Sequence, residues 1–127
     1  RVNEVRDNLG KLLIDLKQQG YSIAGYGAPT KATTMLMHFG LSQEILDFTV
    51  EDNPLKYGCF LPGALIPILP ADELYRRRPD YVVILAWNFA NSIMDKHRRY
   101  HNEGGRFILP MPEPQIVEQL NTYLKQT

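Results

Sequence analysis

Tyr21-Ser22-Ile23-Ala24-Gly25-Tyr26-Gly27-Ala28-Pro29-Thr30-Lys31 predicts a short buried strand, a turn with two glycines and the start of a helix. We expect Gly25 and Gly27 to take positive φ and to let a ligand approach the backbone closely. Pro29 suits a first helical turn, whose free amides can face an anion, and Lys31 adds a positive charge nearby. The stretch therefore predicts a phosphate-binding turn, with a purely structural tight turn as the alternative.

The composition is that of a small neutral domain. The chain has 127 residues, with 14 basic and 14 acidic side chains, so we expect a single domain at 1–127 with no overall field for nucleic acid or membranes. The only cysteine excludes an internal disulfide, and no apolar run approaches the roughly 20 residues of a membrane span. We expect a cytoplasmic protein and, because the sequence does not begin with Met, a piece of a longer chain.

Strand and helix patterns alternate along the chain. Strands are expected at 22–25, 48–51, 65–69, 81–85 and 106–109, and helices at 30–38, 71–77, 89–102 and 115–125, after an amphipathic helix that Gly20 ends. This alternation predicts an α/β fold, a Rossmann-like open and mostly parallel sheet with helices on both faces, preceded by the N-terminal amphipathic helix.

Polar residues follow the expected strands, where such sheets bind ligands. Asp52 lies roughly 25 residues beyond Gly27, at the position of an acid that binds a ribose, although Asp52 and Asn53 alternatively only shape the turn at Pro54. Trp87 is interpreted as a stacking or interface residue, with core packing as the alternative, and Asn88 also suits an N-cap. The candidate binding residues are Gly25, Tyr26, Gly27, Ala28, Lys31, Asp52, Asn53, Lys56, Tyr57, Trp87 and Asn88.

The sequence offers little evidence for catalysis within this chain. His97 and His101 are four residues apart on a predicted helix, as metal ligands often are, but no third ligand accompanies them. We therefore interpret both as part of a solvated helix face. Cys59 lacks a context that would activate a thiolate, and no general base has an evident partner. We predict neither a catalytic residue nor a metal site.

Several short motifs occur in a recognisable order. They are the turn from Gly25 to Lys31, Glu51-Asp52-Asn53-Pro54-Leu55-Lys56-Tyr57-Gly58, Leu61-Pro62-Gly63, Ile66-Pro67-Ile68, Arg78-Pro79-Asp80-Tyr81, Trp87-Asn88 and Gly104-Gly105-Arg106-Phe107. Together they cover nearly the whole chain from Gly20 to Pro112. The set resembles the C-terminal domain of the sugar C-methyltransferase family.

The resemblance implies a three-part enzyme: a zinc-binding region, a central domain that holds S-adenosylmethionine, and this domain. Such enzymes methylate a carbon of a nucleotide-linked deoxy-keto-sugar, with the acid–base residues expected in the central domain. This chain would bind the nucleotide-diphosphate handle of the sugar, pack on the missing central domain and hold no cofactor itself. Two alternatives stay open, an NAD(P)- or coenzyme-A-binding Rossmann domain and a ligand-free scaffold.

Overall fold

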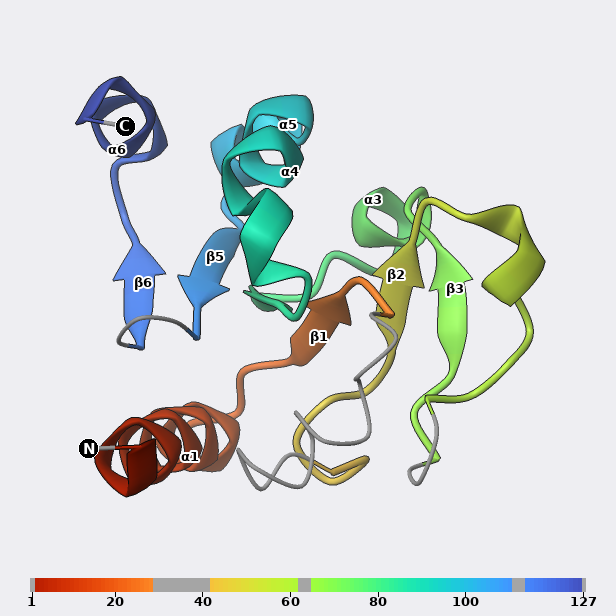
Figure 1. The fold of residues 1–127 in the computed structure, drawn as a ribbon, viewed down its shortest axis with the longest axis horizontal. Helices are drawn as coiled ribbons and strands as arrows, with labels where there is room; N and C mark the ends of the chain where they lie inside the picture. Colours follow the sequence, from red (N-terminus) through yellow and green to blue (C-terminus); the bar gives the residue numbers. More distant parts are fainter. Residues whose placement is uncertain (1, 29–41, 62–64, 111–113, 127) are drawn as a thin grey trace.

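The computed structural model describes residues 2–28, 42–61, 65–110 and 114–126 (Figure 1). The strands in these ranges are β1 (Ile23–Tyr26), β2 (Thr49–Glu51), β3 (Ile68–Pro70), β4 (Tyr81–Ile84), β5 (Arg106–Leu109) and β6 (Gln115–Val117). The helices are α1 (Val2–Gln18), α3 (Glu73–Arg77), α4 (Ala90–Lys96), α5 (Arg98–Asn102) and α6 (Leu120–Gln126), with short 3-10 turns η1 (Pro54–Lys56) and η2 (Trp87–Phe89). No helix in the described ranges is long and apolar enough to cross a membrane.

These strands form one sheet in the order β3-β2-β1-β4-β5-β6. Neighbouring strands from β3 to β5 run parallel, and β6 pairs antiparallel with β5. The predicted α/β class with a mostly parallel sheet is therefore confirmed. The helix expected at 30–38 lies outside the described residues. Because parallel strands end at one edge, the loops after β1, β2 and β4 meet there.

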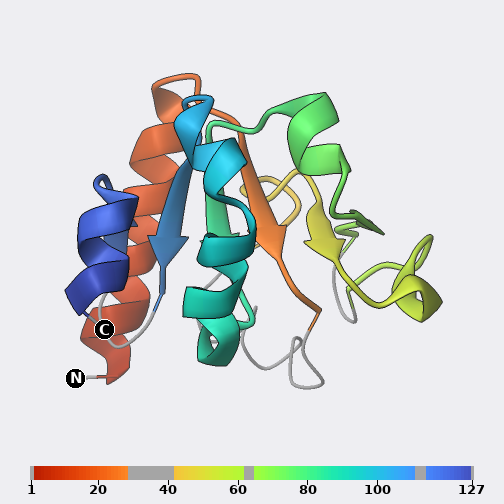
Figure 2. The ribbon, with the colours of Figure 1, turned by 90° about the horizontal axis from the view of Figure 1, so that it is seen from above.

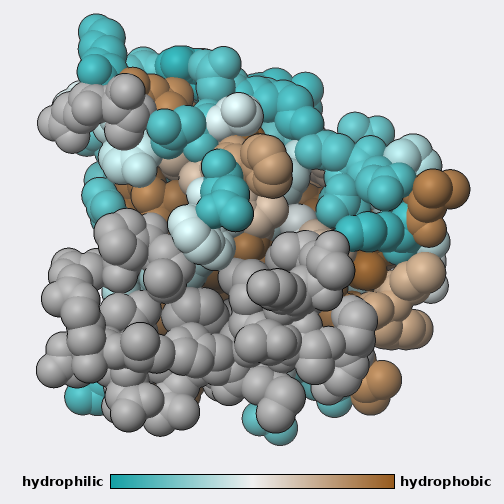
Figure 3. All heavy atoms as spheres, in the orientation of Figure 1, coloured by the Kyte–Doolittle hydropathy of each residue, from teal (hydrophilic) through white to brown (hydrophobic). Residues whose placement is uncertain are grey.

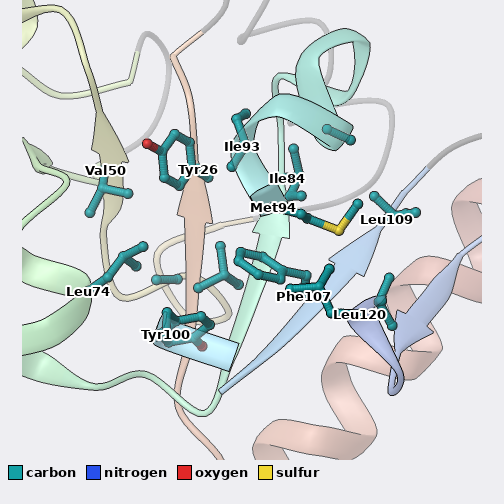
Figure 4. Packing of buried hydrophobic residues seen from close by; sticks show 14 of the residues in the cluster. Tyr26, Val50, Leu74, Ile84, Ile93, Met94, Tyr100, Phe107, Leu109 and Leu120 are labelled. Carbon is teal, nitrogen blue, oxygen red and sulfur yellow. The ribbon is translucent and has the colours of Figure 1, made fainter. Parts of the chain in front are cut away.

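Apolar side chains alternate between the two faces of the central strands, as the pleat requires. Val83 joins a buried cluster with Leu13 and Leu16 of α1, whereas its neighbours Val82 and Ile84 join a second cluster on the opposite face. That second cluster includes side chains from α3, α4, α5 and α6. Figure 2 shows α1 and α4 on opposite sides of the sheet, and Figure 4 shows the packing beneath α4.

The single helix predicted at 115–125 is wrong in its first part. Gln115–Val117 is strand β6, and α6 begins only at Leu120. Ile116 and Val117 pair with Ile108 and Phe107 of β5, so they complete the edge of the sheet. Both are β-branched and suit a strand, but their spacing also fits a helix face, and so periodicity alone misassigned them.

The helix predicted at 89–102 is also wrong as one continuous element. The chain forms η2, then α4, and then α5 after a break at His97, whose backbone has φ −115° and ψ 38°. Asn88 lies inside η2, and the residue before α4 is Phe89, which makes no side-chain capping bond. The expected N-cap at Asn88 is therefore wrong, because the 3-10 turn delays the start of the helix.

Candidate functional site

The turn after β1 packs tightly against the segment after β4. Gly27 has φ +106°, as expected, and a Cβ there would lie 2.7 Å from the Cβ of Ala86. Gly25 does not take positive φ, so that expectation is wrong. It lies inside β1, where a Cβ would come within 3.0 Å of both Leu85 Cδ1 and Thr49 Oγ1. Lack of space, not the dihedral angle, favours glycine at position 25.

Backbone groups at this turn bond within the protein. The Gly27 amide donates to a carbonyl of β2 over 2.7 Å, and the Ala28 amide donates to Glu51 Oε1 over 3.1 Å. Lys56 Nζ in turn donates to the Ala28 carbonyl over 2.5 Å. The amides on which the phosphate prediction depends most directly belong to residues 30 and 31, which lie outside the described ranges together with the side chain of Lys31.

Asp52, directly after β2, collects two donors from separate elements. The Tyr26 hydroxyl donates to its carboxylate over 2.9 Å to Oδ1 and 3.1 Å to Oδ2, and Lys96 Nζ of α4 lies 2.9 Å from Oδ2. Burial tends to raise the pKa of Asp52, but the hydrogen bonds from Lys96 and Tyr26 and the charge of Lys96 lower it below its ordinary value. About half of the Asp52 side chain remains exposed, so this ionised carboxylate can accept further hydrogen bonds from outside.

A buried histidine extends this polar chain into the protein. The Tyr26 hydroxyl oxygen lies 2.9 Å from His97 Nε2, and His97 Nδ1 lies 2.7 Å from the Tyr75 hydroxyl. The Tyr26 ring is 1% exposed and stands beside Val50 and Ile93 in Figure 4. Burial and then the charge of Lys96 lower the pKa of His97.

The interpretation of both histidines as a solvated face is wrong. His97 is 6% exposed, and His101 is half-buried. The break between α4 and α5 places His97 on the same inner side as Ile93 and Met94, which lie four and three residues earlier. Both His97 nitrogens have tyrosine hydroxyls as partners, so the ring is used in a hydrogen-bond network.

A hollow of about 290 Å³ lies at the carboxyl ends of β4 and β5. Its lining includes Trp87 and Asn88 of η2, Asn91 of α4, Leu109 of β5 and Tyr123 of α6. Trp87 is 42% exposed, so the core-packing alternative for this residue is wrong. An exposed indole face beside amide groups can stack on a planar ring.

The predicted binding residues thus separate into groups. Tyr26 and Asp52 are in contact, Lys56 contacts Ala28, and Trp87 and Asn88 line the hollow. Asn53 Oδ1 accepts from the amide of Leu55 over 3.1 Å and so caps η1, as the structural alternative for this residue expects. Tyr57 is half-buried beside η1.

Sequence reasoning missed three members of the site, namely Lys96, His97 and Tyr75. One available signal was the position of His97 on the apolar stripe of its helix, at i+4 from Ile93 and i+3 from Met94. A histidine on that stripe is buried and needs polar partners. No comparable pattern marks Lys96 or Tyr75, because their roles depend on how α3 and α4 pack over the sheet.

Comparison with known proteins identifies the family of this chain. Residues 1–112 match the family model described as the C-methyltransferase C-terminal domain. The chain is also 38% identical over 118 residues to the C-methyltransferase NovU of Streptomyces niveus. That alignment covers 93% of this chain and 28% of the relative's length. The chain therefore belongs to the C-methyltransferase C-terminal domain family, which confirms the resemblance stated from the sequence.

Proposed function

We propose that this chain binds the nucleotide-diphosphate handle of a nucleotide-linked deoxy-keto-sugar within an S-adenosylmethionine-dependent C-methyltransferase. The observation that carries the proposal is the pair of Asp52 and Lys96, 2.9 Å apart at the carboxyl edge. Asp52 offers a carboxylate for sugar hydroxyls, and Lys96 offers an ammonium group for phosphate. Family membership supports the setting, and the exposed Trp87 offers a surface for the base.

Holding an unreactive handle is useful to a methyltransferase. Binding energy gained at the nucleotide can orient the reacting carbon beside the methyl donor, and this orientation lowers the barrier. In this proposal the chain is a single Rossmann-like domain, with an N-terminal amphipathic helix, of a larger cytoplasmic enzyme. The chain spans 28% of the length of its curated relative, which leaves room for a separate catalytic domain.

We assign proton abstraction and the methyl donor to that other part of the enzyme. Burial and then Asp52 strongly raise the pKa of Tyr26, so its phenol stays protonated, and both nitrogens of His97 are already in hydrogen bonds. Neither group is suited to act as a base. S-adenosylmethionine would supply the methyl group, but the Ala28 amide and carbonyl at the turn after β1 are engaged by Glu51 and Lys56, which does not suit a cofactor there.

Exposed apolar side chains support a neighbouring domain as partner. Leu55 is 87%, Phe60 55% and Leu65 67% exposed, and all three lie in the connection between β2 and β3. Figure 3 shows hydrophobic surface at the right-hand margin, where Figure 1 draws η1. Apolar surface gathered in one place favours contact with another protein surface.

Calorimetric titration with thymidine diphosphate tests the binding proposal. We expect the chain to bind and the Asp52→Asn variant to lose about tenfold or more in affinity, because a hydrogen bond to a charged group is removed. Asp47→Asn is the matched control, since Asp47 pairs with Lys17 over 3.2 Å at the other edge, and its affinity should not change.

The same titration separates the alternatives. Tighter binding of NAD(P) or coenzyme A would favour a dinucleotide or coenzyme domain. Absence of heat with all of these ligands would favour the ligand-free scaffold. Equal losses in Asp52→Asn and Asp47→Asn would contradict the assignment of the site to the carboxyl edge.

A further inference from the structure

We infer that His97, Tyr26 and Tyr75 are positioning residues that hold Asp52 as a directed acceptor for a hydroxyl group of the ligand. Their hydrogen bonds connect Tyr75 of α3, His97 at the break between α4 and α5, and Tyr26 of β1 to Asp52 after β2. The ligand part of this inference rests on the proposed function. The order of the protons along these hydrogen bonds does not rest on the proposed function, and it can be measured without a ligand.

The direction of the chain follows from counting protons. Asp52 is a carboxylate and only accepts, so the Tyr26 hydroxyl donates to it over 2.9 Å. The Tyr26 oxygen then accepts from His97 Nε2, 2.9 Å away. A neutral imidazole that carries its proton on Nε2 accepts at Nδ1, where the Tyr75 hydroxyl lies 2.7 Å away and donates. A single arrangement therefore satisfies each polar atom from Tyr75 to Asp52.

The opposite tautomer would release Asp52. With the proton on Nδ1, His97 would donate to Tyr75, and Nε2 would draw the Tyr26 hydroxyl proton away from the carboxylate. Asp52 would then keep only Lys96 as a partner among these groups, and its orientation would be set by one flexible ammonium. The tautomer of a residue 6% exposed thus decides how an exposed carboxylate is presented to a ligand.

The surroundings of His97 keep the ring neutral. The titratable and charged groups around His97 come from several elements: Tyr26 of β1, Asp52 after β2, Asp72 and Tyr75 at α3, and Lys96 at the end of α4. Arg99 of α5 lies over the Tyr75 ring, 4.0 Å from its centroid. Burial and Lys96 lower the pKa of His97, and Asp52 and Asp72 oppose this. The neutral His97 ring that these hydrogen bonds require is therefore present near pH 7.

Nuclear magnetic resonance of the full chain labelled with 13C and 15N tests the proton order. We expect the His97 signals at pH 7 to be those of the neutral tautomer with hydrogen on Nε2. In the Tyr26→Phe variant the pKa of Asp52, followed through its carboxyl 13C shift, should rise because a donor is lost. An Nδ1-protonated ring in the unmodified chain, or an unchanged Asp52 pKa in Tyr26→Phe, would overturn the inference even if ligand binding proved correct.

A second measurement tests whether these hydrogen bonds affect ligand binding. The unmodified protein should bind thymidine diphosphate about tenfold more tightly than its 3′-deoxy analogue, because the oriented Asp52 carboxylate loses a hydrogen-bond donor when the hydroxyl is missing. His97→Leu should reduce this ratio toward one, whereas His97→Gln, which keeps a donor for Tyr26, should retain part of it. Equal ratios in the unmodified protein and His97→Leu would overturn the positioning role, and absence of binding by the unmodified protein would instead refute the proposed function.

Discussion

The two edges of the sheet both gather polar side chains, but they use them differently. At the amino edge, Asp80 Oδ2 accepts from the Ser22 amide over 2.8 Å, and the Asp80 amide donates to Ser22 Oγ over 3.0 Å. The Tyr100 hydroxyl donates to the Pro79 carbonyl over 2.7 Å. At the carboxyl edge Glu51 and Lys56 also bond to the backbone of Ala28. A further series of hydrogen bonds there runs from side chain to side chain and ends at the half-exposed Asp52.

This difference indicates which edge is built to bind. Hydrogen bonds that close on the backbone satisfy groups left over where strands begin, and they fix the crossover connections. The side chains that order the exposed carboxylate of Asp52 do not complete any backbone ladder, so their arrangement is better explained by what the carboxylate contacts. We therefore expect changes at the amino edge to alter stability alone, and changes at the carboxyl edge to alter the properties of Asp52 as well.

The largest effect is expected at the amino edge. A Cβ at Gly105 would lie 2.1 to 2.4 Å from ring atoms of Tyr100, whose hydroxyl is held by Pro79. Gly105→Ala should therefore lower the free energy of unfolding by about 3 kcal/mol, measured by urea denaturation. Gly20→Ala is the control, because a Cβ there meets nothing within 4 Å and only the φ of +94° is strained. It should lower the free energy of unfolding by about 1 kcal/mol. Equal costs would contradict the clash.

Much of the fold could be predicted from the sequence because the central strands carry strong local signals. The strand at 106–109 has the predicted bounds, β1 is shifted by one residue at both ends, and β4 ends one residue earlier than predicted. The misassigned segment at 115–117 could not be resolved locally, since Ile116 and Val117 fit a strand and a helix face equally well. Its strand conformation depends on the free edge of β5.

The candidate site was predictable only in part. Asp52 was identified because its place after the second strand is set by topology, which the alternation of elements reveals. His97 was misinterpreted because its neighbours in sequence are charged, whereas its partners Tyr26 and Tyr75 are 71 and 22 residues away. Contacts of that separation depend on how the helices pack on the sheet. Sequence patterns of period 2 or 3.6 contain no information about them.

A pair of matched lysine variants sharpens the comparison between the edges. Lys96 pairs with Asp52 over 2.9 Å, and Lys17 pairs with Asp47 over 3.2 Å near the amino edge. Both pairs are solvent-accessible, so Lys96→Ala and Lys17→Ala should each cost less than about 1 kcal/mol of unfolding free energy. Only Lys96→Ala should raise the pKa of Asp52, as followed by carboxyl 13C titration. A rise of similar size in Lys17→Ala would contradict the local role of Lys96.

A pH dependence of stability is also expected to arise at the carboxyl edge. The pKa of His97 is lower in the folded protein than its ordinary value of about 6.5, so the unfolded chain binds more protons just below that pH. The free energy of unfolding should therefore fall as the pH is lowered from about 6.5 toward the folded-state pKa, by at most about 1.4 kcal/mol per pH unit for one proton. Urea denaturation between pH 5 and pH 7.5 should show a shallower dependence for His97→Gln. Ser22→Ala breaks hydrogen bonds at the amino edge without removing a titratable group, so it should keep the original dependence of unfolding free energy on pH. An unchanged slope in His97→Gln would show that His97 is not the group that makes the carboxyl edge sensitive to pH.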